Sequence, residues 1–320
     1  MRAPEFWARD GCLPRLLAPG SMVTGWMTAR RVAKPGWRAS VPVFCCGNAS
    51  VGGSGKTTVA LDLLQRLQSR ALTPHALLRG YGGREKGPLR VDLERHDAAQ
   101  VGDEALLLAA CAPTWIAADR AAGARAAVAA GASAIVMDDG LQNSGLLKSC
   151  SLLVIDGGAG FGNGRLLPAG PLREPIAAAA ARCQAAVLIG EDAKDARAAL
   201  PSGIPLFAAK LVQDLGDLAP GTDYLAFAGI GRPEKFFAGL RASGVSLRAT
   251  QAFPDHHAYA ERDLARLLER AAASGLRLVT TPKDAVRLPP AWRERVDVAG
   301  VTLSWEDPGQ IDALLNQALQ

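Results

Sequence analysis

Two kinds of hydrophobic pattern alternate through the middle of the chain. Short runs of consecutive apolar residues predict strands at 43–46, 76–78, 114–116, 134–137, 152–155 and 186–189. Longer segments with apolar positions three or four residues apart predict helices at 56–68, 103–111 and 120–130. Strands that are apolar on both faces and alternate with helices are typical of a parallel sheet with helices on both faces, so we expect an α/β fold.

A second set of elements follows the first. Its strands are predicted at 224–228, 246–249, 276–280 and 296–301, and its helices at 233–241, 261–273 and 309–319. Between the two sets, residues 213–222 contain Gly216, Pro220 and Gly221, which favour a linker. We therefore expect a core domain at 41–215 and a second, smaller α/β domain at 216–320, preceded by a distinct segment at 1–40. The smaller domain is expected to close a cleft over substrates.

The strand at 43–46 runs into a glycine-rich loop that ends in Gly-Lys-Thr-Thr. This order predicts a P-loop NTPase-like core, in which backbone N–H groups and a helix N-terminus surround phosphate oxygens. We expect Lys56 to reach the β- and γ-phosphates and the Thr57 hydroxyl to bind Mg²⁺. A glycine turn unrelated to phosphate is the alternative. The expected nucleotide-binding residues are Ser50, Val51, Gly52, Gly53, Ser54, Gly55, Lys56 and Thr57, with Ser50 standing where the usual pattern has glycine.

A pair of carboxylates ends the predicted strand at 134–137. A P-loop needs an acidic partner for magnesium at the end of a neighbouring strand, and Asp138 and Asp139 stand at such a position. We expect one to hold the metal and the other to orient a reacting group. The alternative is a plain strand-end turn, because Asp-Gly is common in turns. ATP and Mg²⁺ are therefore the expected ligands.

A P-loop alone does not choose between a GTPase, a motor ATPase and a small-molecule kinase. Guanine recognition is not expected, because the segment 281–284 (Thr-Pro-Lys-Asp) lacks the residue that separates Lys from Asp in guanine-binding elements. A kinase needs a base near the acceptor hydroxyl and cations for the charges of the acceptor. Candidate residues of both kinds occur in polar segments at 79–83, 102–104, 165–174 and 253–257.

These polar segments carry a family resemblance. Residues 50–57, 79–83, 102–104, 138–142, 161–175, 227–237, 253–257 and 283–287 stand in the order found in tetraacyldisaccharide 4'-kinases, which the chain resembles up to about residue 290. The resemblance implies ATP-dependent phosphorylation of the 4'-hydroxyl of a tetraacylated glucosamine disaccharide 1-phosphate. It also implies a peripheral location on the cytoplasmic face of the inner membrane. The alternative that the residues leave open is a membrane-associated P-loop ATPase switch without a small-molecule acceptor.

The resemblance also assigns roles to residues. It implies that Asp103 is a general base paired with a histidine from the Asp-His-His segment, which we take as His256, although sequence alone does not separate it from His257. A helix cap is the alternative for Asp103. The expected catalytic residues are Asp103, His256, Lys56 and Asp139. The expected metal ligands are Thr57, Asp138, Asp139 and Glu104, and the expected lipid-binding residues are Arg79, Tyr81, Gly82 and Arg173, although a plain surface loop is equally consistent with 79–83.

The chain departs from the family pattern near its magnesium carboxylates. Asn143 stands where the family usually has histidine, and Lys148-Ser149 replaces the usual Arg-Asp. Asparagine can hydrogen-bond, but it does not titrate near neutral pH. We expect the substitution to be tolerated, because the proposed base lies elsewhere.

Charge is concentrated at the N-terminus. Residues 1–40 hold seven basic and two acidic residues, and this difference accounts for the whole net charge of +5. The same segment contains Trp7, Trp26 and Trp37. A basic, aromatic leader on a neutral body favours contact with an anionic membrane surface. The alternative is a helix packed on the domain with solvated arginines. Pro14 and Pro19 interrupt the apolar stretch, so neither a secretory signal nor a membrane span is expected.

The remaining composition narrows the class of protein. None of the cysteines forms a CxxC pair, so core packing in a reducing compartment is expected for them. Nucleic-acid binding is disfavoured, since the body is electroneutral and shows no basic stripe. The family resemblance implies an acylated disaccharide phosphate as substrate, the leader favours an anionic membrane as a second partner, and the protein is expected to be a monomer.

Overall fold

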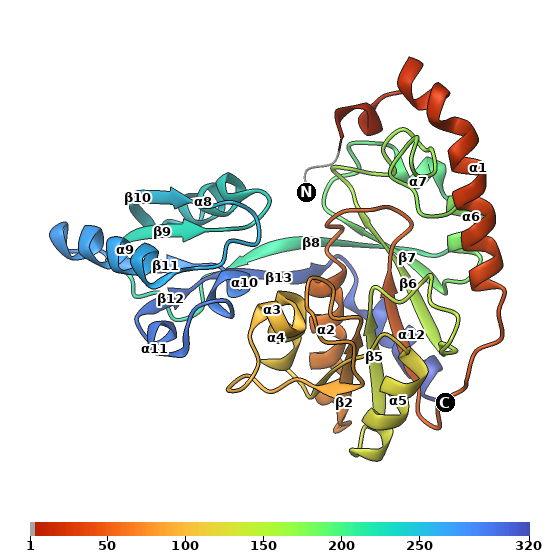
Figure 1. Cartoon of the computed structure of the whole chain (residues 1–320), viewed down its shortest axis with the longest axis horizontal. Coiled ribbons are helices and arrows are strands. Elements are labelled where there is room, and N and C mark those ends of the chain that lie inside the picture. The colour runs from red at the N-terminus through yellow and green to blue at the C-terminus, as the bar shows by residue number, and fades with distance from the viewer. Residues whose placement is uncertain (1–3) are drawn as a thin grey trace.

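The computed structural model describes residues 4–320 and contains two β-sheets (Figure 1). The larger, nine-stranded sheet contains β1 (Val43–Gly47), β2 (Pro74–Leu78), β3 (Leu89–Arg90), β4 (Thr114–Ile116), β5 (Ala134–Asp138), β6 (Cys150–Asp156), β7 (Ala185–Ile189), β8 (Leu206–Asp214) and β13 (Gly300–Trp305). The smaller sheet contains β9 (Asp223–Ala228), β10 (Ser246–Ala252), β11 (Arg277–Thr280) and β12 (Val296–Val298). Both cores are therefore α/β in character.

The helices connect these strands. They are η1 (Glu5–Ala8), α1 (Cys12–Val32), α2 (Lys56–Gln68), α3 (Ala98–Val101), α4 (Asp103–Ala109), α5 (Arg120–Ala129), α6 (Ile176–Ala180), α7 (Ala196–Ala199), α8 (Pro233–Ala242), α9 (Glu261–Ala273), α10 (Pro282–Ala285), α11 (Pro290–Arg293) and α12 (Pro308–Leu319). The alternation of strand and helix matches the hydrophobic pattern, and the predicted strands and helices of the core appear near their expected bounds.

The large sheet has the order β13-β8-β7-β6-β1-β5-β2-β4-β3, and β1 lies at its centre between β5 and β6. Helices α2, α4 and α12 pack on one face of the sheet, and α5 and α6 contribute to the cores on the other face. Because β1, β2, β5, β6 and β7 run parallel, their carboxyl ends meet at one edge. In open α/β sheets, this edge is where ligands bind.

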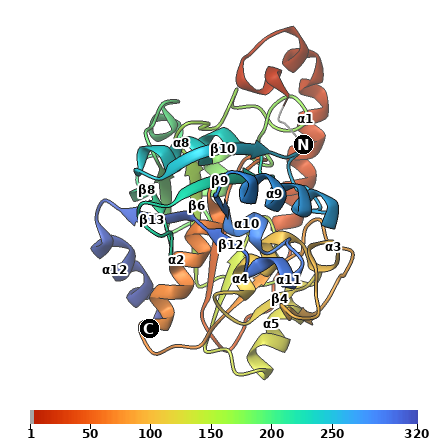
Figure 2. The same cartoon turned by 90° about the vertical axis from the view of Figure 1, so that its left-hand side faces the viewer.

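The small sheet is parallel, with the order β10-β9-β11-β12. Helix α8 packs against one face and α9 against the other. An antiparallel ribbon of β8 and β13 extends from the large sheet toward this unit (Figure 1). Seen from the side of the small unit, α10 lies beside α4, and the two helices are in contact (Figure 2). The small unit therefore reaches the ligand-binding edge of the large sheet.

The end of the chain corrects the expected domain boundary. The predicted strand at 296–301 is two strands: β12 belongs to the small sheet, whereas β13 pairs with β8 in the large sheet. After β13, α12 packs on the core of the large sheet and Asp312 forms ion pairs with Arg66 and Arg70. The small unit therefore spans residues from β9 to β12, not all of 216–320. The hydrophobic pattern did not predict that the chain returns to the large sheet, because the pattern of two adjacent short strands does not show which sheet each strand joins.

The leader contains a 21-residue helix, α1, which continues through Pro19. One side of α1 packs on the loops of the large unit: Ser21 Oγ donates to Leu166 O at 2.7 Å, and Gly25 leaves no room for a side chain beside Leu166. Arg2 lies outside the described residues. In residues 4–320, every helix falls short of the length and apolarity that a bilayer crossing requires.

Candidate active site

The loop between β1 and α2 has the geometry of an anion-binding turn. Gly55 caps α2 in the left-handed region, with φ of 83°, and a Cβ there would lie 2.6 Å from Ile189 Cδ1, so only glycine fits. Around Gly52 and Gly53, no atom would lie within 4 Å of a Cβ. The buried Asn48 side-chain amide donates a hydrogen bond to Ser54 Oγ at 3.0 Å, which stabilises the conformation of the loop. The loop thus leaves open space in front of a helix N-terminus, which suits phosphate groups.

Asp138 ends β5 and is almost fully buried beside this helix. The Thr57 hydroxyl donates to Asp138 Oδ2 at 2.8 Å, while Asp138 Oδ1 has no hydrogen-bond partner among residues 4–320. Burial, and then the nearby Glu104 carboxylate, raise the pKa of Asp138 to about 7. Hydroxyl and carboxylate oxygens are the ligands that Mg²⁺ prefers, so this pair fits a magnesium ion that also binds phosphates.

Asp139 holds the phosphate-loop lysine in place. It adopts a left-handed backbone conformation with φ of 53°. Its Oδ1 lies 3.8 Å from Lys56 Nζ and accepts a hydrogen bond from Arg173 Nη1 at 2.8 Å. Although burial acts to raise it, these two cations hold the pKa of Asp139 below its ordinary value. Asp139 is therefore an anion beside Lys56, separate from the raised-pKa carboxyl of Asp138.

The predicted metal ligand Glu104 has a cationic partner in the small unit. Its Oε1 is 3.6 Å from Lys283 Nζ. In the part of the chain that the structure describes, no group of three or more His, Cys, Asp or Glu side chains is arranged to hold an ion by itself. Magnesium in nucleotide sites is usually held by one or two carboxylates together with phosphates and water, so Thr57 and Asp138 fit that pattern without Glu104.

The predicted lipid ligand Arg173 has partners within the protein. Its guanidinium donates to Asp139 Oδ1 at 2.8 Å and to Gln142 Oε1 at 3.3 Å. Its backbone N–H donates to Ala49 O at 2.7 Å, which joins the 161–175 segment to the phosphate loop. The geometry associates Arg173 with the nucleotide side of the site.

Gln142 connects the phosphate loop to Glu174, and the sequence analysis assigned it no role. Its Nε2 donates to Asn48 O and to Glu174 Oε1, each at 2.8 Å. Glu174 is almost fully buried and also accepts two bonds from Arg182, at 2.7 Å each. This chain of bonds secures the base of the phosphate loop. Gln142 belonged to the family-like segment at 138–142, but no signal in that segment indicated its partners.

Asp103 lies at the start of α4 and is the centre of a second polar cluster. The backbone N–H of Glu104 donates to its Oδ1 at 3.0 Å. Its Oδ2 faces three nitrogen groups: His256 Nδ1 at 3.0 Å, Arg287 Nη2 at 3.1 Å and Lys283 Nζ at 3.6 Å. Although burial acts to raise it, these groups hold the pKa of Asp103 below its ordinary value. Asp103 is therefore a buried, ionised carboxylate.

The two adjacent histidines have different partners. His256 adopts a left-handed conformation, with φ of 57°, and contacts Asp103 across the two units. His257 points elsewhere: its Nε2 lies 3.1 Å from Asp263 Oδ2, and its ring stacks on Phe253 with centroids 4.6 Å apart. The geometry therefore pairs His256 with Asp103 and leaves His257 in the packing of the small unit.

The glycine-rich segment 79–83 lies directly beside Asp103. Gly102 has φ of 85°, and a Cβ there would lie 2.5 Å from Tyr81 O, so the loop and the start of α4 touch at this point. Arg79 and Gly82 are exposed, and the Tyr81 side chain is 81% exposed. The positive charge of Arg79 adds to burial in lowering the pKa of the buried Arg120 to about 10. The exposed Arg79 and the exposed Tyr81 ring, two positions apart in this segment, form a surface suited to an anionic sugar.

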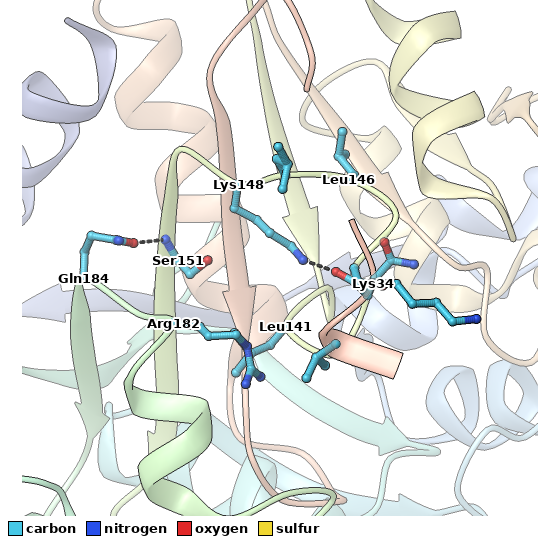
Figure 3. A pocket seen from close by; sticks show the side chains of 11 residues that line it. Lys34, Leu141, Leu146, Lys148, Ser151, Arg182 and Gln184 are labelled. Atoms are coloured by element: carbon cyan, nitrogen blue, oxygen red, sulfur yellow. Dashed lines mark hydrogen bonds between the residues drawn. The ribbon is translucent and has the colours of Figure 1, made fainter. Parts of the chain in front are cut away.

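Asn143 lines a pocket of about 210 Å³ whose lining residues include neither Asp138 nor Asp139 (Figure 3). Lys148, Arg182, Ser151 and other side chains line this pocket, and Lys148 Nζ donates to the backbone oxygen of Asn143. Neither Asp103 nor His256 lines it. The position that departs from the family pattern therefore lies outside the Asp103 cluster.

Lys283 and Arg287 are two further site residues to which the sequence analysis assigned no role. Helix α10 contains only four residues and ends at Ala285, so Lys283 lies within it and Arg287 lies beyond its end. Both side chains converge on Asp103. The available signal was the segment 283–287 in the family resemblance, which carried no indication of its partner.

Comparisons with known proteins agree with this geometry. A family model described as tetraacyldisaccharide-1-P 4'-kinase matches residues 13–320. A tetraacyldisaccharide 4'-kinase of Gluconacetobacter diazotrophicus is 58% identical over 100% of this chain and 98% of its own, and one of Rhodospirillum centenum is 53% identical over 98% and 96%.

A solved structure supports the fold. The crystal structure of the apo form of LpxK from Aquifex aeolicus in complex with ATP covers 97% of this chain and 100% of its own, with a TM-score of 0.79 at 25% identity. The expected P-loop-type α/β fold is confirmed, and the family match favours a kinase over an ATPase switch. The chain belongs to the tetraacyldisaccharide-1-P 4'-kinase family.

Proposed function

We propose that this chain transfers the γ-phosphoryl group of ATP to the 4'-hydroxyl of a tetraacylated glucosamine disaccharide 1-phosphate. The chain belongs to a kinase family, and one observation supports the proposal most directly. The phosphate-binding loop and the buried carboxylate of Asp103 lie at the same edge of the large sheet. The two are close, because helix α2, which begins at Lys56, is in contact with helix α4, which begins at Asp103. Such proximity brings donor and acceptor groups together.

The nucleotide side of the reaction is assigned to the loop from Ser50 to Thr57. Its N–H groups and Lys56 bind the β- and γ-phosphates, while Thr57 and Asp138 hold Mg²⁺. When bound, Mg²⁺ neutralises the charge that develops on the phosphate oxygens. Asp139 and Arg173 hold Lys56 in position through the contacts described above.

The acceptor side is assigned to Asp103 and His256. As the 4'-oxygen bonds to the γ-phosphorus, the bond from that phosphorus to the β–γ bridging oxygen breaks and ADP leaves. The hydroxyl proton passes to the Asp103 carboxylate, and the neighbouring His256 imidazole gives a route for it toward solvent. Arg79, Tyr81 and Gly82 form the surface that orients the sugar and its 1-phosphate.

The lipid must be presented at a membrane, and α1 is the element suited to this contact. Its large apolar side chains remain exposed on the side away from the core: Leu16 by 76%, Met22 by 77% and Trp26 by 61%. Arg30 and Arg31 end the same helix. An apolar helix face beside basic residues binds anionic lipid surfaces. The proposed location is therefore peripheral, on the cytoplasmic face of the inner membrane, and the proposed oligomeric state is a monomer.

The test is direct incubation of the purified protein with ATP, Mg²⁺ and the disaccharide 1-phosphate in mixed micelles. Mass spectrometry of the lipid is expected to show the addition of one phosphoryl group, and removal of Mg²⁺ with a chelator should abolish it. ATP hydrolysis without a phosphorylated lipid would instead support an ATPase switch and would reject the kinase assignment.

A further inference from the structure

Arg287 is a buried cation that crosses from the small unit to the large one. Its side chain is only 4% exposed. One nitrogen, Nη1, donates to Gly229 O at 2.9 Å and to Asp284 Oδ1 at 3.1 Å, while Nη2 donates to Asp103 Oδ2 at 3.1 Å. The guanidinium therefore bridges two buried carboxylates that lie on different units.

Asp284 is the anchor of this arrangement. It is fully buried, and its Oδ1 also accepts from Tyr259 OH at 2.7 Å and from the Gly229 N–H at 2.9 Å. Its Oδ2 accepts from Thr281 Oγ1 at 2.6 Å. Hydrogen bonds from this many donors fix the orientation of the Asp284 carboxylate. Because the Arg287 guanidinium is planar and bonds this carboxylate, its own orientation is fixed as well.

The other two side chains that face Asp103 Oδ2 are more exposed to solvent than Arg287 is. Lys283 is 31% exposed and its ammonium lies 3.6 Å away, while His256 is 53% exposed. Lysine is a flexible point charge, and an exposed ring moves more easily than a buried guanidinium. Among these contacts, Arg287 is the one with the geometry to fix the direction of the carboxylate.

We propose that Arg287, anchored by Asp284, is a positioning residue that directs the Asp103 carboxylate toward the acceptor hydroxyl. The inference rests on the proposed function, because it concerns the base of that reaction. Arg287 does not touch the reacting atoms in this assignment: it acts through Asp103. Because its anchor lies on the small unit, the proper orientation of Asp103 depends on that unit being docked.

A double-mutant cycle tests this role. We expect Arg287→Met to lower kcat by ~10²-fold, comparable with loss of a general base, with the KM for ATP unchanged. In an Asp103→Ala background, the same change should have less than ~3-fold further effect, because residues that act as a unit are not additive. Arg287→Lys keeps the charge but not the fork, so it should remain at least ~10-fold below the unaltered protein.

Lys283→Met is the matched control, since it removes a cation from the same carboxylate. We expect it to lower kcat less than Arg287→Met does, because its contact is longer and more exposed. Should Arg287→Met fail to fold by circular dichroism, the cycle is run with Arg287→Lys, whose loss must likewise vanish in the Asp103→Ala background.

The outcomes separate the inference from the function on which it rests. Absence of lipid product from the unaltered protein would reject both. An active protein in which the Arg287 and Asp103 losses multiply, or in which Arg287→Lys is fully active, would overturn the positioning role alone. Normal turnover of Asp103→Ala would also overturn it, since no carboxylate would then need positioning.

Discussion

The phosphate loop and the Asp103 cluster lie at the same edge of the sheet but are assembled from different parts of the chain. The loop is built from consecutive residues, Ser50 to Thr57, and the distant side chains that secure its base, such as Gln142, also belong to the large unit. The Asp103 cluster instead gathers side chains as distant as Arg287, which lies 184 positions along the chain and in the small unit. One site is contained in the large unit, whereas the other exists only when two units are docked.

This difference has a functional consequence. A loop made by its own backbone can hold a nucleotide whatever the position of the small unit. The base, in contrast, acquires its partners His256, Lys283 and Arg287 only from that unit. Nucleotide binding and catalytic competence should therefore be separable by mutation, and the following changes test that separation from the largest expected effect on turnover to the smallest.

Lys56→Ala should have the largest effect. Removal of the ammonium beside the phosphates takes away both binding and charge stabilisation, so we expect lipid product to fall below detection, on the order of 10³-fold or more. Circular dichroism should show an unchanged fold. Substantial turnover in this variant would show that the phosphates bind elsewhere.

Asp103→Ala should separate the two regions most clearly. We expect kcat to fall by at least ~10²-fold while ATP binding, measured by calorimetry, stays intact. Glu261→Ala, a change to an exposed carboxylate at the start of α9, is the control and should behave as the unaltered protein. Loss of ATP affinity in Asp103→Ala would contradict the independence of the phosphate loop.

Changes on α1 lie away from both regions and test lipid presentation. Replacing Leu16, Met22 and Trp26 with serine should weaken binding to anionic vesicles at least ~10-fold, because exposed apolar side chains no longer enter the interface. Turnover in mixed micelles should change less than the vesicle affinity. Serine at Val212 and Val301, which are exposed on the β8–β13 ribbon, is the control. Equal vesicle binding by both variants would reject the α1 face.

Asn143→His should have the smallest effect on turnover. The side chain lies in the pocket of Figure 3, whose lining residues include neither Asp103 nor His256. We expect the rate to stay within about 3-fold, because the proposed base is unchanged. A rise of ~100-fold, worth about 2.7 kcal/mol in the barrier, would mean that an imidazole at this position takes part in the chemistry.

Sequence alone determined the local features of this protein. The strands and helices of the core follow from hydrophobic period, and the nucleotide loop follows from Gly52, Gly55 and Lys56 at a strand-to-helix junction. Asp138 was predictable because it ends the buried run that forms β5. These features depend on interactions between near neighbours in the chain, so a local pattern is sufficient to reveal them.

Tertiary structure alone decided which distant groups meet. The pairing of β13 with β8 brings the end of the chain back to the large sheet, and no local pattern distinguishes that strand from β12. The choice of His256 over His257, the bond from Arg173 to Asp139 and the convergence of Lys283 and Arg287 on Asp103 likewise depend on how two units pack. Contacts of this kind arise from sheet order and side-chain direction across the fold, which residue spacing does not encode.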